Sequence, residues 1–132
     1  MNIFTDEIEV RTKDQIELVD ITSEVQKVVR ESKISDGIVL IYTRHTTAAI
    51  IINEADGRLI NDMINSLKKW VPISAGYKHG GNAHSHIKAS FIGPSETIPL
   101  LKGNIKLGTW QSVFFAEFDG PRSRSVLVQI LS

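Results

Sequence analysis

The sequence predicts a single-domain α+β fold in which a large, mostly antiparallel or mixed β-sheet or sandwich is covered by two α-helices. Three observations predict this fold. Short β-branched and apolar segments recur along the chain and outnumber the helical patterns. Both helical patterns come early in the chain. No repeat, linker or shift in composition divides the 132 residues, so we expect one domain over residues 1–132.

The N-terminal part is expected to form a β-hairpin followed by a helix. Polar and apolar residues alternate over 3–11, and a second strand pattern follows over 15–19 after a polar turn. Valine and isoleucine at helical spacing predict a helix over 22–33. Ser23 followed by Gln26 is typical of a capping box at its start.

Two buried strands and a second helix are expected next. The nearly continuous apolar runs over 38–43 and 48–53 are typical of strands covered on both faces. Leucine, isoleucine and methionine at helical spacing predict a helix over 56–70, which Pro72 ends. Residues 73–86 have no periodic pattern and are expected to form a long loop. The remaining strands are expected over 87–92, 97–101, 105–107, 111–118 and 125–131.

Composition narrows the function classes. Lys+Arg and Asp+Glu both number 15, so the chain has no net charge and lacks the positive surface typical of nucleic-acid or membrane binding. A pI near 6.9 leaves little charge repulsion between copies, which favours an oligomer. The chain has no cysteine, no signal-peptide pattern and no apolar run of ~20 residues. We therefore expect a cytoplasmic protein without nucleic-acid or membrane partners, in which nitrogen and oxygen hold any metal.

The four histidines fall in two short segments. His79, His84 and His86 lie in one glycine-rich stretch, and His45 precedes two threonines. Because imidazole binds metals and carries protons near neutral pH, this clustering predicts a metal or anion site. Imidazole suits zinc, whereas magnesium prefers oxygen, so the expected divalent metal is zinc. The spacing alone does not select the ligands.

Polar residues follow His45 and end the second apolar run. Thr46 and Thr47 come directly after the histidine, and Asn53 and Glu54 close the run. Together they predict a polar cavity in which Asn53 and Glu54 contribute to catalysis. Alternatively, the threonines simply favour a strand, while Asn53 and Glu54 cap and start the second helix.

Two C-terminal segments carry further candidates. Thr109, Trp110 and Gln111 follow a glycine and could line a pocket with an aromatic wall and two hydrogen-bonding groups. The alternative is a core tryptophan within a bulge. Arg122 and Arg124 could bind phosphate near a hairpin turn, or could be exposed charges of an edge strand. The nucleotide-binding and serine-hydrolase motifs are absent.

Three segments, taken together, resemble the YjbQ-like family over nearly the whole chain. They are His45–Glu54, Asn82–Ser90, and a stretch from Gly103 through Leu107-Gly108-Thr109-Trp110-Gln111 and Glu117 to Asp119-Gly120-Pro121-Arg122. The resemblance implies a small α+β protein that assembles as a homotrimer. It also implies a thiamine-phosphate synthase activity, which some members show weakly and for which the family is often labelled secondary thiamine-phosphate synthase.

The resemblance further implies a centre of His45, His79 and His86, with Asn53, Glu54, Thr109, Gln111 and Glu117 as candidates around it. Some relatives carry a histidine directly after Glu117, where this chain has Phe118, so a proton-transfer role of that histidine does not apply here. The expected metal ligands are His45, His79 and His86; the catalytic candidates are Asn53, Glu54 and Glu117; and the substrate- or anion-binding candidates are Thr46, Thr47, Asn82, His84, Lys88, Thr109, Trp110, Gln111, Arg122 and Arg124.

Three functions are consistent with these residues. The first is a transferase that joins an aminopyrimidine diphosphate to a thiazole phosphate and releases diphosphate, with cations from Lys88, Arg122 and Arg124. Such chemistry usually uses magnesium held by carboxylates, so we expect at most a side activity. The second is a zinc hydrolase with Glu54 or Glu117 as general base. The third is a non-enzymatic trimer that binds a phosphorylated metabolite or another anion.

Overall fold

The computed structural model describes all residues from 1 to 132 and has the α+β architecture that the sequence predicts. The helices are α1 (Thr22–Ser32), α2 (Gly57–Trp70) and α3 (Ala83–Ile92). The strands are β1 (Ile3–Arg11), β2 (Glu17–Asp20), β3 (Gly37–Tyr42), β4 (Ala48–Asn53), β5 (Ser95–Leu101), β6 (Asn104–Ile105), β7 (Ser112–Glu117) and β8 (Ser123–Leu131).

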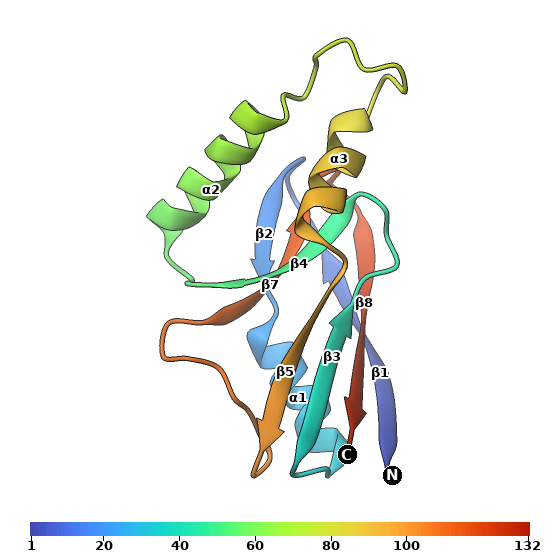
Figure 1. The fold of residues 1–132 in the computed structure, drawn as a ribbon, viewed down its shortest axis with the longest axis vertical. Coiled ribbons are helices and arrows are strands. Elements are labelled where there is room, and N and C mark those ends of the chain that lie inside the picture. The colour runs from blue at the N-terminus through green and yellow to red at the C-terminus, as the bar shows by residue number, and fades with distance from the viewer.

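The strands form two antiparallel sheets. Five strands pair in the order β1-β8-β3-β5-β6, and three pair in the order β2-β7-β4 (Figure 1). The main core lies between these sheets and contains 17 buried residues, to which α1 contributes Val25, Val28 and Val29. The bounds of the strands predicted over 38–43 and 48–53 are confirmed to within a residue at each end. The prediction that both strands are covered on both faces is wrong for β3, which buries Val39 and Ile41 on one face and exposes Ile38 and Tyr42 on the other.

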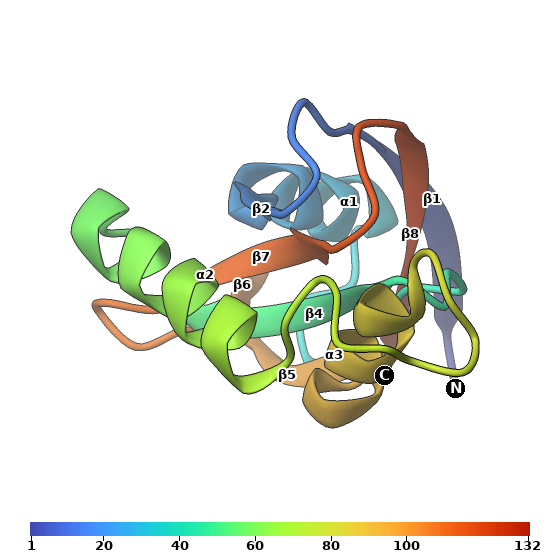
Figure 2. The same cartoon turned by 90° about the horizontal axis from the view of Figure 1, so that it is seen from above.

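The second face of the three-stranded sheet lies under α3 and α2. A smaller apolar cluster joins Ala49 and Ala116 of this sheet to Ala89 of α3, with Ile64 and Leu67 of α2 packed beside it. Figure 2 shows α1 on one side of β7 and β4 and α3 on the other, while α2 lies across the ends of these two strands. None of the residues of α2 is fully buried, whereas α1 buries three valines. None of the three helices combines the length and the apolar composition that a membrane-spanning helix requires.

Two local predictions for the N-terminal part are wrong. The segments 3–11 and 15–19 do not pair as a hairpin, because β1 pairs with β8 and β2 pairs with β7 in the other sheet. The capping box of Ser23 and Gln26 does not form either. The Asp20 carboxylate accepts hydrogen bonds from Thr22 instead, and the Gln26 amide bonds the backbone at residues 103 and 105.

A third helix replaces part of the expected loop and a predicted strand. Residues 83–92 form α3, although the sequence predicts a loop up to 86 and a strand over 87–92. The buried positions include His84, Ser85, Lys88 and Ala89, which recur at helical spacing. Three of these four are polar, so a search for apolar periodicity does not find the buried side of this helix.

Candidate functional site

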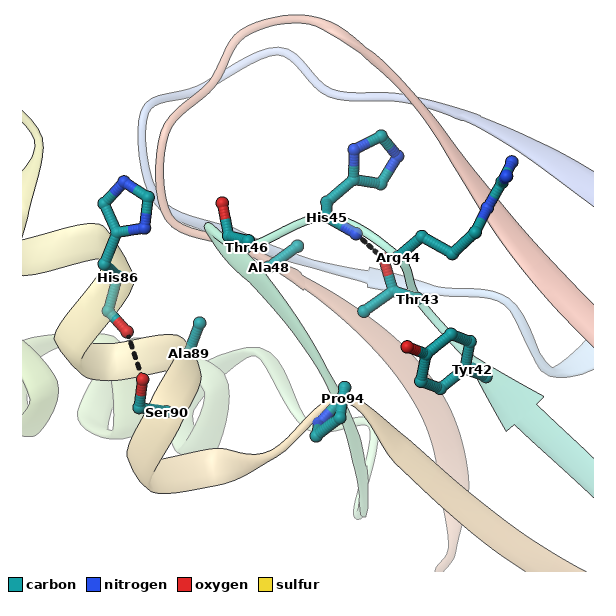
Figure 3. Close-up of a pocket in the computed structure, with 10 residues that line it drawn as sticks. All are labelled: Tyr42, Thr43, Arg44, His45, Thr46, Ala48, His86, Ala89, Ser90 and Pro94. Carbon is teal, nitrogen blue, oxygen red and sulfur yellow. Dashed lines mark hydrogen bonds between the residues drawn. The ribbon is translucent and has the colours of Figure 1, made fainter.

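A polar cavity of about 360 Å³ opens between the β3–β4 connection and α3. This volume lies in the range of small-molecule sites, which is roughly 300–1,000 Å³. The connection supplies two of the predicted residues, and α3 supplies one. The lining residues, drawn in Figure 3, are Tyr42, Thr43, Arg44, His45, Thr46, Ala48, His86, Ala89, Ser90 and Pro94.

His45 is held from both its backbone and its ring. Its backbone N–H donates to Thr43 Oγ1 at 3.3 Å, and its Nε2 accepts a hydrogen bond from the backbone N–H of Ser125 at 3.1 Å. Burial, followed by the Arg124 guanidinium, lowers the pKa of His45 below its ordinary value. His45 is therefore a neutral, fixed imidazole at physiological pH.

His86 and His79 meet near the mouth of the cavity. Their ring centroids lie 5.1 Å apart in an edge-to-face arrangement. His79 Nδ1 donates to the carbonyl of Gly80 at 3.1 Å, and both Gly80 and Gly81 have positive φ angles that turn the chain back toward α3. Because His86 also lines the cavity with His45, the fold gathers three predicted histidines at one end of the molecule.

A buried ion pair lies behind this end. Arg124 binds both carboxylate oxygens of Glu117, with Nε at 2.9 Å from Oε1, and its Nη2 donates to Thr47 Oγ1 at 2.7 Å. Thr12 Oγ1 donates to Glu117 Oε1 at 2.8 Å, and the backbone N–H of Asp119 donates to Oε2 at 3.1 Å. Although burial raises the pKa of Glu117, the hydrogen bonds from Arg124 and Thr12 hold it below its ordinary value. Glu117 is thus an ionised anchor for Arg124, fully buried and outside the cavity lining.

A second buried polar chain runs along α3. Lys88 Nζ donates to His84 Nδ1 at 2.6 Å, His84 Nε2 contacts Ser85 Oγ at 3.2 Å, and Ser85 Oγ donates to the carbonyl of Phe118 at 2.7 Å. Since Ser85 uses its proton on Phe118, His84 must donate from Nε2 and accept from Lys88 at Nδ1. Burial, followed by repulsion from Lys88, lowers the pKa of His84. The neutral histidine therefore serves as the acceptor for a buried ammonium.

Asn82 and Arg122 converge on the β7–β8 turn. Asn82 Nδ2 donates to Asp119 Oδ2 at 2.9 Å, and Arg122 Nη2 donates to the same oxygen at 3.0 Å. Arg122 Nε also donates to the Asp119 carbonyl. These contacts tie the start of α3 to the turn that carries Glu117 and Arg124.

Five predicted residues lie at the opposite end of the three-stranded sheet. Asn53 ends β4 and pairs in register with Ser112, so Glu54 and the segment 109–111 lie on that side. β4 begins three residues after His45 and runs for six residues, or roughly 17 Å at ~3.3 Å per residue. Trp110 is 73% exposed and forms no part of the core. One chain therefore does not bring Asn53, Glu54, Thr109, Trp110 and Gln111 to the cavity.

The residues of one chain do not fit the expected zinc centre. No three histidine, aspartate or glutamate side chains converge closely enough to hold a metal ion. His45 and His79 each use a ring nitrogen on the backbone, at Ser125 and Gly80 respectively. The histidines are neighbours around a cavity and do not form a closed ligand set.

The sequence analysis missed two residues of the cavity wall, Arg44 and Ser90, and one hydrogen-bond partner of Glu117, Thr12. Arg44 lines the cavity and directly precedes His45, so its position beside a predicted site residue was a signal in the sequence. Ser90 lies one helical turn after His86 and donates to its carbonyl at 2.8 Å, a relation that appears only once the segment is known to be helical. Thr12 carried no signal, because it is distant in sequence from every other site residue.

The sequence and the fold both match known proteins. The family described as UPF0047 protein YjbQ-like matches residues 6–132. A UPF0047 protein of Methanothermobacter thermautotrophicus is 45% identical over 133 residues, covering 98% of this chain and 93% of the relative. The UPF0047 protein YugU of Bacillus subtilis is 37% identical over 131 residues, covering 94% and 96% of the two chains.

Two crystal structures have the same fold. A YbjQ-like protein of unknown function from Sulfolobus solfataricus superimposes with a TM-score of 0.97 at 41% identity, covering 99% of this chain and 98% of the other. An uncharacterised conserved protein of the yjbq/upf0047 family from Clostridium acetobutylicum gives a TM-score of 0.93 at 46% identity, covering 96% and 99%.

Proposed function

This chain belongs to the YjbQ-like UPF0047 family, and from that premise we propose that it binds a phosphorylated small molecule in the histidine cavity. One observation carries the proposal: the cavity is lined by groups that donate to anions and by no carboxylate. Arg44 offers a guanidinium, His45 and His86 offer imidazoles, and Thr46 offers a hydroxyl. Guanidinium and hydroxyl donors of this kind recognise phosphate oxygens.

Arg44 is available to a ligand at low cost. Its Nη2 lies 3.1 Å from Glu7 Oε1, but the two side chains are 62% and 51% exposed. An exposed ion pair of this kind is worth at most about 1 kcal/mol, so a doubly charged phosphate can displace Glu7 from the guanidinium.

A thiamine-phosphate synthase-like transfer is the reaction that we propose for this site, as a weak activity. Departure of diphosphate needs hydrogen-bond donors that stabilise the negative charge developing on the leaving group, and the cavity supplies such donors. The zinc hydrolase finds less support, because it needs a general base beside a metal. Glu117 is committed to Arg124, and Glu54 lies at the far end of β4.

We also propose that the chain assembles as a homotrimer in the cell. Large apolar side chains remain exposed on separate elements of a single chain, and burying them between copies would remove them from water. They include Ile38, Trp70, Phe91 and Trp110, which are 52%, 76%, 78% and 73% exposed. Sedimentation equilibrium tests this directly. The measured mass is expected to be that of three 14.7 kDa chains, and a mass of 14.7 kDa at micromolar concentration would refute the trimer.

Calorimetric titration with inorganic phosphate and with diphosphate tests the binding proposal. Wild-type protein is expected to bind diphosphate saturably, and Arg44→Met to bind it roughly tenfold or more weakly, because a charge-assisted hydrogen bond is lost. The matched control is Arg30→Met, which removes an exposed arginine of α1 outside the cavity. Absence of saturable binding, or equal loss in both variants, would refute the proposal. Formation of thiamine phosphate from both precursors, lost in Arg44→Met, would support the transfer reaction.

A further inference from the structure

We propose that the backbone amide of Ser125 fixes His45 as the Nδ1–H tautomer, so that His45 acts as a neutral hydrogen-bond donor to a phosphoryl oxygen in the cavity. The tautomer follows from the fold alone, whereas the identity of the acceptor rests on the proposed function above. This assigns His45 the role of an electrophile and assigns Ser125 the role of a positioning residue.

The tautomer follows from what an amide can do. The backbone N–H of Ser125 lies 3.1 Å from His45 Nε2 and can only donate a hydrogen bond. His45 Nε2 must therefore present its lone pair. A neutral imidazole carries one proton, so that proton is on Nδ1. In Figure 3 one ring nitrogen of His45 faces the side of Thr46 and His86, and the other faces away from them.

The sheet register explains why Ser125 is free to make this bond. β3 pairs with β8 from Ile38 opposite Leu131 to Tyr42 opposite Leu127, and there β3 ends. Ser125 lies two residues beyond that last pair, where β3 no longer supplies a carbonyl. The side chain of His45, three residues after Tyr42, takes that place. The end of the strand thus sets the orientation of the ring.

The surroundings keep the ring neutral. Burial and then the charges of Arg124, Arg44 and Arg122 oppose protonation of His45 and lower its pKa, and Glu117 alone favours protonation. The Glu117 carboxylate is already bound by Arg124 and Thr12, so its attraction for an imidazolium is largely compensated. Arg124 and Ser125 are adjacent in β8, so one strand supplies both the opposing charge and the amide.

A neutral donor of this kind suits charge that develops during a reaction. A preorganised N–H aimed at a phosphoryl or leaving-group oxygen stabilises growing negative charge without giving up its proton. The role differs from that of a general base, which would need a lone pair facing the ligand. It also differs from metal ligation through Nε2, which would require the Ser125 bond to break.

Nitrogen NMR of the free protein tests the tautomer directly. The four histidines are labelled with ¹⁵N, and the ring signals of His45 are identified by their loss in His45→Gln. We expect a protonated Nδ1 and an unprotonated Nε2 at pH 7.5, with correlations of the Nδ1–H type. A protonated Nε2, or protons on both nitrogens, would overturn the proposal whether or not the protein binds phosphate.

Two pairs of variants complete the test. Ser125→Ala keeps the backbone N–H and is expected to leave the His45 tautomer unchanged. Ser125→Pro removes the N–H, so His45 is expected to populate both tautomers. If Ser125→Pro does not fold, the wild-type spectrum and Ser125→Ala still decide the tautomer. For the donor role, His45→Asn places an amide N–H near the position of Nδ1 and is expected to retain diphosphate affinity within about threefold, while His45→Leu loses roughly tenfold. Equal losses in the two variants would overturn that role without touching the binding proposal.

Discussion

Lys88 is a fully buried cation without a buried anion beside it. Its ammonium has one hydrogen-bond partner, His84 Nδ1, and no carboxylate lies within ion-pair distance. Burial of a charge without a counter-charge costs stability. Lys88→Met keeps the length of the side chain and removes the charge, so we expect it to raise the free energy of unfolding at pH 7 by about 1–3 kcal/mol in urea denaturation.

Two further variants separate charge from packing at this position. Lys69→Met removes an exposed lysine of α2 and is expected to change stability by less than about 0.5 kcal/mol. His84→Ala leaves the buried ammonium without an acceptor and is expected to cost roughly 3 kcal/mol. A loss of stability in Lys88→Met comparable to that in His84→Ala would show that Lys88 contributes a favourable contact.

The buried ammonium also predicts a pH dependence of stability. Burial, followed by repulsion from Lys68, lowers the pKa of Lys88 to about 8 from an ordinary 10.5. Between these values the unfolded chain binds a proton that the folded chain does not, so the free energy of unfolding rises with pH. The advantage of Lys88→Met over wild type is therefore expected to be greatest below pH 8 and to shrink from pH 8 to 10 in urea titrations. A constant difference would contradict the lowered pKa.

At the scale of elements, the β7–β8 turn depends on a glycine. A Cβ built on Gly120 would lie 2.3 Å from the Asp14 carbonyl oxygen and 2.9 Å from both Glu117 Cγ and Thr12 Oγ1. We expect Gly120→Ala to lower the free energy of unfolding by about 2 kcal/mol or more, because backbone has to move. Thermal melts of both variants test this. Gly57→Ala is the control, because a Cβ at that position has nothing within 4 Å, and it is expected to leave the free energy of unfolding unchanged or to raise it.

Periodicity located the apolar elements and failed where a helix buries polar side chains. The helices α1 and α2 and the strands β3 and β4 each carry an apolar repeat, and their bounds agree with the prediction to within about a residue. α3 buries His84, Ser85 and Lys88, whose hydrogen bonds to one another compensate for burial. That compensation depends on tertiary contacts, which no local window of sequence contains.

The difference between local sequence patterns and tertiary contacts also explains which site residues the sequence could predict. Clustering in the sequence identified all four histidines, and the fold gathers three of them, His45, His79 and His86, around the cavity, while His84 is buried beside Ser85 and Lys88. Neighbouring strands, however, place Asn53 and Trp110 at the other end, because strand length sets their distance from His45. Strand pairing between distant segments also creates the contact of Thr12 with Glu117, which are 105 positions apart.

At the scale of the whole molecule, one ion pair joins the two sheets. Glu117 belongs to β7 of the three-stranded sheet and Arg124 to β8 of the five-stranded sheet. Thr12 after β1 and Thr47 before β4 bind the same pair, so four segments meet there. The pair is completely desolvated, with side chains 3% and 0% exposed. It therefore fixes the relative position of the sheets beside the histidine cavity.

Breaking this pair is expected to be far more harmful than replacing it. Glu117→Gln leaves a buried guanidinium without its counter-charge, and we expect the free energy of unfolding to fall by about 3–5 kcal/mol. Glu117→Leu combined with Arg124→Leu removes both charges and is expected to recover much of that loss, because neither buried charge is then unpaired. Urea denaturation of Glu117→Leu, Arg124→Leu and the double variant gives the coupling energy between the two positions. Additive losses would show that the carboxylate and the guanidinium act independently, and that the packing around them, instead of their pairing, holds the sheets together.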